Sequence, residues 1–522
     1  MTQSRARLWL ITALGSLAWL LIDPPTPDLA AHEYRAELVD LTGFGIWEQG
    51  WYAGHHLPGY SVLFPLSGAL LTPQLVAALC AVLAAWCFER LARGWWDTDA
   101  ATAAATWFAA GVVSTLVGGQ LAFAAGLAPA LGALLAARNG RLPLASALGA
   151  LTTLTSPVVA AFLVLACGAW WLGGVARPRA ALVVGAGAIV PGLMIALAFP
   201  EGGMQPFAFS SFFWSFVVAI ALGAGLPRRE RVLRAGAALY AAALIAGIVI
   251  DTPLGGNLVR LAAVFGGPLA AGALWERRRH VAIAALAVPL LYWQWLAPVR
   301  SVIRGAGDPS SKRAYHEPLI VELDRRARLE GPFRTEIPFT ANHWETRYVA
   351  PDHPLARGWE RQLDVKLNGL FYDDEPLTAR RYRAWLDALA VGYVALPGVE
   401  LDPAGQKEGT LVRAGLVPGL REVWRSRNWV LYAVGNPRAL ASAPARVTRV
   451  AVDELALTTP RAATVDVRVR FTPYWSLASG RGCVSEAPGG WTRVQLDGAG
   501  TARLSIRFSL TRVRSRSERC SR

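Results

Sequence analysis

The chain has 522 residues, of which 53% are hydrophobic and only 17% charged, and its mean hydropathy is +0.33. This composition excludes an ordinary soluble protein of the same size and predicts a polytopic membrane protein. The net charge of +15 comes almost wholly from arginine, because lysine occurs only at Lys312, Lys366 and Lys407. Many arginines lie in short clusters between apolar runs, which indicates membrane topology rather than nucleic-acid binding.

About eleven apolar runs approach the ~20 residues that a helix needs to cross a bilayer. In chain order they cover 7–22, 72–91, 98–117, 119–137, 142–155, 157–174, 180–198, 207–225, 235–251, 256–275 and 280–298. The fifth and sixth runs are short and are joined by Ser156 and Pro157, so they could instead form one kinked span.

The basic clusters decide between these two counts, because short arginine-rich loops are retained on the cytoplasmic side. The clusters are Arg5 with Arg7, Arg90 with Arg93, Arg138 with Arg141, Arg177 with Arg179, Arg228 to Arg234, and Arg277 to Arg279. All fall on one side if eleven helices cross and the N-terminus is cytoplasmic. A merged span would place the later clusters on the outer face, so we predict about eleven transmembrane helices in residues 1–298.

This topology places two segments outside the cytoplasm. Residues 23–60 become the first extracytoplasmic loop, and the chain after 298 becomes an extracytoplasmic region. There we predict an α+β domain over 299–440, with helices at 312–330 and 376–390 and strands at 391–398 and 421–434. A β-rich domain follows over 441–510, with a strand at 464–471, and the basic tail 511–522 is predicted to be disordered.

The first loop opens with ionisable residues directly after the first apolar run. In "DLAAHEYR", Asp28 and His32 are four residues apart, and Arg35 follows Asp28 by seven. A helix would therefore place this carboxylate, imidazole and guanidinium on one face. The alternative is an interfacial amphipathic helix that exposes these charges to water.

The rest of the loop is dense in Trp, Tyr, Gly and Pro and contains His55 and His56. This composition suits an interfacial cleft with aromatic walls, or a simple aromatic belt. A metal site on Asp28 and the two histidines is possible, but the ligand spacing does not support it, because adjacent histidines project in different directions. We therefore predict no metal ligands and no cofactor.

A second set of polar residues, Asp251, Asn257 and Arg260, lies at or just inside the outer end of a predicted span. Charges near membrane depth are usually paired or functional. Arg260 could clamp a phosphate, or could pair with Asp251 and join two helices. Arg300 is another charge on the predicted outer face, and Glu201 is a further one.

The five cysteines contain no CxxC pair, and Cys80, Cys87 and Cys167 fall inside apolar runs. Cys483 and Cys520 lie in the predicted outer region, where oxidising conditions allow a disulfide. Whether these two pair is left open by the sequence, because Cys520 lies in the predicted tail.

Several segments resemble a set of bacterial integral membrane proteins, most of them uncharacterised, some of which are labelled as related to 6-pyruvoyl-tetrahydropterin synthase and some as transporters. They are "PDLAAHEYR", "WEQGWYAGHHLPGYSVLFP", "TPLGGNLVRL", "ANHWETRYVA", "LARGWERQLD" and "FTPYWS". The architecture, with a first span, a large outer loop opening on an acid, many further spans and an outer C-terminal region, resembles the GT-C superfamily of polytopic glycosyltransferases.

The GT-C resemblance implies a sugar transferase of the bacterial plasma membrane that uses a polyprenyl-phosphate donor and a glycan or lipid acceptor at the extracytoplasmic face. In that superfamily an acid of the first outer loop is the catalytic base, and Asp28 matches best. No adjacent acidic pair precedes Glu33, so the choice among Asp23, Asp28 and Glu33 stays open.

In the same reading His32 would orient or tune Asp28, and an arginine would neutralise the lipid phosphate. Arg260 is the first choice for that arginine, with Arg35 or Arg300 as substitutes. The further predicted substrate-binding residues are Glu33, His55, His56, Asp251 and Asn257. The partners would be the donor, the acceptor and membrane lipids.

Two other functions fit the composition. A transporter or flippase for a lipid or envelope precursor would need a pathway through the helix bundle, whereas no charged relay lies at the predicted middle of the membrane. A non-enzymatic scaffold for envelope assembly would use the outer region to bind a partner.

Overall fold

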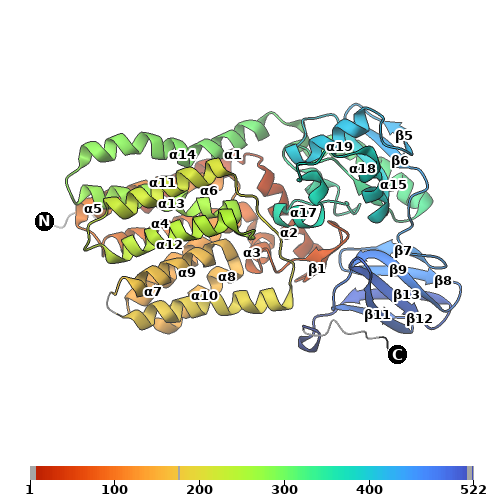
Figure 1. Cartoon of the computed structure of the whole chain (residues 1–522), viewed down its shortest axis with the longest axis horizontal. Coiled ribbons are helices and arrows are strands. Elements are labelled where there is room, and N and C mark those ends of the chain that lie inside the picture. The colour runs from red at the N-terminus through yellow and green to blue at the C-terminus, as the bar shows by residue number, and fades with distance from the viewer. Residues whose placement is uncertain (1–6, 175–176, 514–519, 521–522) are drawn as a thin grey trace. The chain divides into compact units, whose positions relative to one another are not determined.

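The computed structural model describes residues 7–174, 177–513 and 520, which divide into two compact units (Figure 1). Unit 1 comprises residues up to Ala36, Tyr60–Ala196 and Gly202–Ala306. Unit 2 comprises Glu37–Gly59, Leu197–Glu201 and the chain from Gly307 onward. The division differs from the predicted one at three places: most of the first outer loop folds with unit 2, residues 197–201 do so as well, and unit 1 extends beyond residue 298.

Unit 1 is helical, and in the part of the chain that the structure describes seven of its helices are long and apolar enough to cross a membrane. They are α4 (Pro73–Ala92), α5 with α6 (Thr98–Gly111 and Val113–Val117), α7 (Leu121–Arg138), α10 (Pro178–Ala198), α12 (Arg231–Val249), η1 with α13 (Gly255–Leu258 and Val259–Trp275) and α14 (His280–Ala306). Four shorter apolar helices are α1 (Trp9–Ile22), α8 (Leu142–Thr155), α9 (Pro157–Leu172) and α11 (Phe209–Gly225). The chain is therefore a multi-pass membrane protein.

These helices begin and end within a few residues of the predicted runs, except that α14 continues to Ala306 instead of stopping at 298. The predicted run ends at 298 because hydropathy falls near Arg300. Hydropathy limits the part of a helix that lipid can surround, but it does not limit the helix, whose backbone hydrogen bonds continue into a polar segment.

Hydrogen bonds join the arginine-rich loops at one end of unit 1, which we call the basic end. Arg138 donates to the carbonyl of Leu91 over 3.2 Å, and Arg177 donates to the carbonyl of Arg138 over 3.0 Å. Between other loops, Arg229 pairs with Glu276 at 2.6 Å. Trp95, after α4, donates to Glu230, after α11, over 3.0 Å. Together these bonds gather the loops after α4, α7, α9, α11 and α13 at the basic end.

Helices α8 and α9 are separate and run in opposite directions. Ser156 between them has an extended backbone, and the hydroxyl of Ser61 donates to the carbonyl of Thr155 over 2.8 Å, away from the basic end. Arg177 beyond α9 nevertheless returns to Arg138 at the basic end. A single kinked span across 142–174 could not bring these two arginines together, because 33 helical residues would extend for about 50 Å.

Unit 2 contains an α+β part built on a four-stranded sheet. The strands run in the order β3 (Arg334–Glu336), β4 (Val391–Pro397), β6 (Trp429–Val434), β5 (Leu420–Arg425), and only the β3–β4 pair is parallel. Helices α15 (Arg313–Glu330), α18 (Ala379–Ala388) and α19 (Pro403–Arg413) belong to this part. The helices predicted at 312–330 and 376–390 and the strands at 391–398 and 421–434 are confirmed.

The remaining part of unit 2 consists of two antiparallel sheets. One has the order β10 (Trp475–Ser479), β13 (Gly500–Ile506), β8 (Glu454–Thr459), β7 (Arg446–Val450). The other has the order β11 (Gly482–Ala487), β12 (Trp491–Leu496), β9 (Ala463–Arg470). Alternate residues of β9, such as Val465 and Val467, are buried in one apolar core, as the period of two in a half-buried strand requires.

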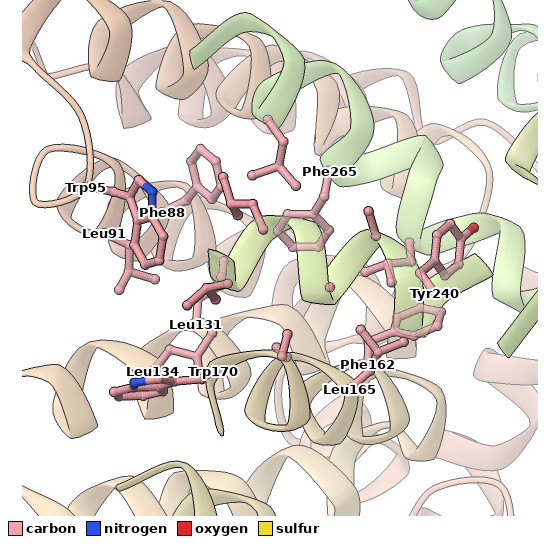
Figure 2. Close-up of a pocket in the computed structure, with 18 of the residues that line it drawn as sticks. Phe88, Leu91, Trp95, Leu131, Leu134, Phe162, Leu165, Trp170, Tyr240 and Phe265 are labelled. Carbon is pink, nitrogen blue, oxygen red and sulfur yellow. The ribbon is translucent and has the colours of Figure 1, made fainter. Parts of the chain in front are cut away.

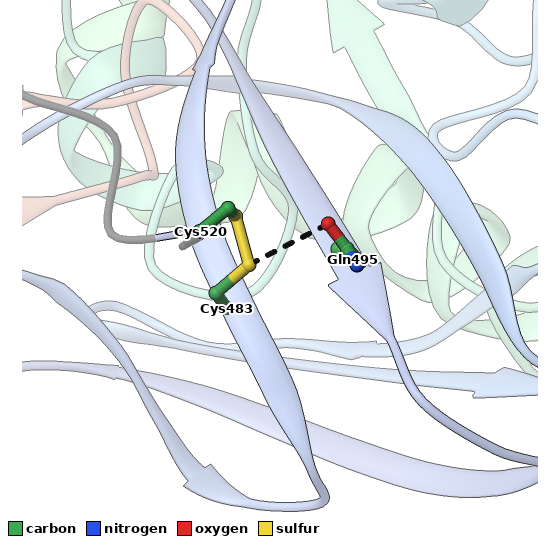
Figure 3. The surroundings of a disulfide bond; sticks show 3 residues. All are labelled: Cys483, Gln495 and Cys520. Atoms are coloured by element: carbon green, nitrogen blue, oxygen red, sulfur yellow. Dashed lines mark hydrogen bonds between the residues drawn. A yellow bond between two sulfur atoms is a disulfide. The ribbon is translucent and has the colours of Figure 1, made fainter. Parts of the chain in front are cut away.

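A disulfide joins Cys483 on β11 to Cys520 (Figure 3). The pairing that the sequence left open is therefore present. Disulfides persist in oxidising compartments, so the bond fits an extracytoplasmic location for unit 2. The predicted disorder of 511–522 concerns a segment of which 514–519 and 521–522 lie outside the described residues.

The middle of the first outer loop is part of the core of unit 2. Strands β1 (Trp47–Glu48) and β2 (His55–His56) form a short antiparallel pair. Trp47 lies in the apolar core of the β-rich part, where its ring meets that of Trp475 at a centroid distance of 6.3 Å. The aromatic residues of this loop are therefore core residues of a folded unit.

Candidate functional site

Helix α2 (Pro27–Thr42) carries the ionisable residues that opened the first outer loop. Proline suits the first turn of a helix because its fixed φ matches and its missing N–H has no helical partner there. Asp28 in that first turn is favoured by the helix dipole, and Gly43 follows the helix with φ +73°. The predicted helix is confirmed, and Asp28, His32 and Arg35 share one face.

This face points into unit 1 and not into water. His32 and Arg35 are each only 2% exposed, and Asp28 is half-buried. The alternative of a helix that exposes these charges to water is therefore contradicted for His32 and Arg35. Burying such groups is costly unless they interact with one another or with other polar groups.

Arg260 interacts with Asp28 although 231 residues separate them in the sequence. Arg260 is in the first turn of α13, is half-buried, and interacts electrostatically with the carboxylate of Asp28. Its guanidinium carbon lies 5.5 Å from the centre of the Phe123 ring on α7. The carboxylate and the guanidinium therefore interact electrostatically at the end of unit 1 opposite the basic end.

His32 lies between charged and aromatic groups. Its ring is 5.1 Å from that of Phe64 on α3 (Leu63–Leu71) and 5.9 Å from that of Tyr60, measured between centroids. Burial, together with the positive charges of Arg35 and Arg260, lowers the pKa of His32 to about 3. The imidazole is therefore neutral at physiological pH.

The two nitrogens of His32 differ in their surroundings. The ring forms one hydrogen bond with the backbone of Gly119, whereas Nδ1 is buried and has no hydrogen-bond partner among the described residues. Buried polar atoms in folded proteins are nearly always hydrogen-bonded. A polar ligand atom is one group that could satisfy Nδ1.

Arg35 packs over an aromatic ring. Its guanidinium carbon is 3.9 Å from the centre of the Tyr60 ring, which is a close cation–π contact. The same Tyr60 ring contacts His32, so the contact holds the guanidinium near His32. A second positive charge is thereby held within the same group of residues as Arg260.

Gly119, in the turn between α6 and α7, allows the chain to pass directly beside the start of α2. Its φ is +74°, and a Cβ added to it would lie 2.3 Å from Oγ1 of Thr26 and 3.5 Å from Cβ of Asp28. Only glycine combines this backbone conformation with such a close approach. The position of Asp28 thus depends on a residue without a side chain.

We define the α2 site as Asp28, His32, Arg35, Tyr60 and Arg260. The sequence identified four of these as candidates, and it missed Tyr60 as well as the supporting Phe64, Gly119 and Phe123. Tyr60 does fall in the aromatic loop segment that was singled out, but composition alone does not say which ring meets an arginine. Gly119 and Phe123 carried no signal, because they come from a turn and a helix far away in the sequence.

The remaining predicted site residues of unit 1 lie elsewhere. Glu33 accepts a hydrogen bond from Gln74 over 3.1 Å, and Asn257 is buried in η1, three residues before Arg260. Asp251 and Arg300 are exposed. Their assignments to substrate binding stay predictions.

His55 and His56 belong to unit 2, and each is buried beside a carboxylate. His55 lies 2.6 Å from Glu48, and His56 lies 2.6 Å from Glu201. Burial alone would lower the pKa of His55, but the Glu48 carboxylate outweighs burial and raises it. Nε2 of His56 also contacts the hydroxyl of Thr472 at 2.9 Å. These contacts hold the loop within unit 2, and the predicted role in substrate binding is untested.

Unit 2 contains a second cluster of buried charges that the sequence did not reveal. Arg357 donates to Asp364 over 2.6 and 3.2 Å and to Glu408 over 2.7 Å. The rings of Phe339 and Phe371 lie 3.9 and 4.0 Å from its guanidinium carbon. None of the three charged side chains is more than 1% exposed. We call this group the Arg357 cluster.

No known protein family matches this chain, and no curated protein is similar to it in sequence. Among the described residues, no three His, Cys, Asp or Glu side chains are arranged so that they could hold a metal ion. Function must therefore be argued from the α2 site itself.

Proposed function

We propose that the protein is a membrane glycosyltransferase that moves a sugar from a polyprenyl-phosphate donor to a cell-envelope acceptor. The observation that carries this proposal is the electrostatic interaction of Asp28 with Arg260 inside unit 1, at the end away from the basic loops. A base next to a cation is what attack on a phosphate-linked sugar requires.

The topology supports this chemistry. Seven long and four short apolar helices would give eleven crossings. The positive-inside rule places the basic end in the cytoplasm, so the α2 site and unit 2 would be extracytoplasmic, at the surface of the bacterial plasma membrane. The Cys483–Cys520 disulfide fits that side. A lipid-linked donor would meet the α2 site at this surface.

In the proposed reaction Asp28 accepts the proton of an acceptor hydroxyl as its oxygen attacks the anomeric carbon of the donor. The bond from that carbon to the phosphate oxygen breaks, and the polyprenyl phosphate leaves with the electron pair. Arg260 and Arg35 stabilise the negative charge that develops on the phosphate. A guanidinium has five N–H donors, so Arg260 can contact both Asp28 and a phosphate.

His32 is a positioning residue in this scheme. Because its pKa is about 3, the imidazole is neutral and would not attract the Asp28 carboxylate as a cation would. It can instead offer its buried Nδ1 to a hydroxyl of the sugar or acceptor. The rings of Tyr60 and Phe64 fix its plane.

The first test uses the full-length protein in lipid nanodiscs, supplied with undecaprenyl-phosphate-linked glucose and, in parallel, with other lipid-linked sugars. Transfer of radiolabelled sugar to envelope glycans is measured. Asp28→Asn should lower the rate at least ~100-fold, since loss of a general base typically costs 10²–10⁴. Its affinity for undecaprenyl phosphate should change little, because both arginines remain.

Asp40→Asn is the matched control, because Asp40 lies exposed on the same helix. It should transfer sugar at the wild-type rate. A correctly inserted Asp28→Asn protein with full activity would remove Asp28 from the mechanism. Absence of transfer by the wild-type protein with every lipid-linked sugar would contradict the proposed function.

A further inference from the structure

A large apolar cavity lies inside unit 1, separate from the α2 site. Its volume is about 700 Å³, and α4, α7, α9, α11, α12 and α13 contribute its walls (Figure 2). Phe88, Leu131, Phe162 and Phe265 are among the side chains that face it. The cavity is partly open to the outside of the unit. Its size is within the range of sites that hold small organic molecules.

The cavity requires an occupant of hydrocarbon character. Protein interiors are close-packed, and an empty space of this size would forfeit contacts on every wall. Water is a poor filling, because each buried water needs two to four polar partners and these walls are almost wholly apolar. The hydroxyl of Tyr240, one of the few polar groups there, donates instead to the carbonyl of Leu258 over 2.8 Å.

Two arginines at the basic end identify the head group of that occupant. Arg138 and Arg177 line the cavity, and each donates a hydrogen bond to a backbone carbonyl, of Leu91 and of Arg138 respectively. One such bond leaves N–H donors on each guanidinium for a ligand, because a guanidinium carries five N–H donors. Trp95 and Trp170 lie at the same end, as amphipathic rings do at a membrane interface.

We infer that this cavity binds an anionic phospholipid from the leaflet at the basic end. One acyl chain fills the apolar space, and the phosphate contacts Arg138 and Arg177. Apolar walls with an arginine pair at the mouth match a chain with a charged head group in both polarity and charge. Under the proposed topology this is the cytoplasmic leaflet.

The lipid site is distinct from the α2 site. Phe123 lies beside Arg260 on one side, and its ring is 6.2 Å from that of Phe162, which lines the cavity. The two rings therefore separate the cavity from the proposed catalytic groups. The inference does not rest on the proposed transferase activity, and Asp28→Asn should leave lipid retention unchanged.

Native mass spectrometry of the full-length protein, released from nanodiscs of mixed phosphatidylglycerol and phosphatidylcholine, tests the cavity. The wild type should retain one phosphatidylglycerol in preference to phosphatidylcholine. Ala237→Phe places a ring in the space that the acyl chain occupies and should lower this retention at least ~10-fold. Ala238→Phe is the matched control, because Ala238 is exposed and does not line the cavity. Equal retention by both variants would overturn the inference.

The charge requirement is tested separately. Arg177→Gln should reduce the preference for phosphatidylglycerol, and Arg177→Lys should restore part of it. Arg179→Gln, at an exposed arginine two residues away that does not line the cavity, should have no effect. If Arg177→Gln retains phosphatidylglycerol as the wild type does, or if phosphatidylcholine is retained equally well by the wild type, the cavity does not select an anionic lipid.

Discussion

The α2 site in unit 1 and the Arg357 cluster in unit 2 both combine arginine with carboxylate, but they differ in enclosure. Asp28 and Arg260 are half-buried, whereas Arg357 is 1% exposed and is held between two aromatic rings. Asp364 is held further by Asn368 over 2.8 Å and by the hydroxyl of Tyr372 over 2.5 Å. The guanidinium of Arg357 donates instead to partners within unit 2, which are Asp364, Glu408 and the carbonyl of Ala404.

The comparison shows that burial of charge is not by itself a sign of function. A buried ion pair whose hydrogen bonds are satisfied within the protein can specify a fold, while one that is still accessible can bind a ligand. We therefore expect mutations in the Arg357 cluster to lower stability, and mutations in the α2 site to lower binding or transfer without unfolding the protein.

The largest effect is expected for Arg357→Met. The substitution leaves Asp364 and Glu408 buried without their positive partner, which typically costs about 3–5 kcal/mol. Urea unfolding of the full-length protein in detergent, followed by proteolytic cleavage within unit 2, measures this change in the free energy of unfolding. Arg381→Met is the control: its pair with Asp373 is about one third exposed, so the loss should stay below ~1 kcal/mol. Equal losses would deny the Arg357 cluster a special role.

A smaller effect, and one on binding, is expected for Arg260→Gln. Hydrogen bonds to charged groups contribute about 1.5–3 kcal/mol, so the affinity for undecaprenyl phosphate should fall roughly 10- to 100-fold. The free energy of unfolding should change much less than in Arg357→Met. Binding to the nanodisc-embedded protein is measured by competition with a fluorescent lipid phosphate.

Arg304→Gln controls for general charge in this experiment, because Arg304 is an exposed arginine of α14. Its affinity should equal that of the wild type. The contrary outcome is that Arg260→Gln unfolds unit 1 while the folded protein that remains binds undecaprenyl phosphate as the wild type does. That result would show that Arg260 stabilises the fold, as Arg357 does, and the two clusters would then not differ.

A third expected effect is a pH dependence in unit 2. Glu345 is fully buried and accepts hydrogen bonds from the backbone N–H and the hydroxyl of Thr340. Burial raises its pKa from 4.5 to about 8, so between these values the folded state binds more protons than the unfolded state. This group therefore lowers stability as pH rises through that window, by at most ~1.4 kcal/mol per pH unit.

Glu345→Gln removes this contribution. Relative to wild type, the variant should gain stability between pH 5 and pH 7.5, as measured by thermal unfolding of the full-length protein at both values. At pH 4, where Glu345 is protonated in both states, the difference between the two proteins should be small. A difference that does not change with pH would show that Glu345 does not titrate in this window.

Sequence reasoning located most of the α2 site because its signals are local. The spacing of Asp28, His32 and Arg35 fixes a common helix face wherever the helix lies. Arg260 stood out because charge is rare in an apolar helix. The sequence did not identify Tyr60 and Gly119, because their roles come from tertiary packing. It also did not reveal the Arg357 cluster, because arginines and acidic residues are common in a polar segment.

The sequence by itself determined the helices of unit 1, the gathering of arginines at one end and four strands of unit 2 (β4, β5, β6 and β9), because hydropathy and periodicity act over neighbouring residues. Only the tertiary structure decided that residues 37–59 fold with unit 2, that Cys483 pairs with Cys520, and that Asp28 interacts with Arg260. These contacts join residues far apart in the chain. They depend on which surfaces pack against one another, and local sequence patterns do not predict which surfaces do so.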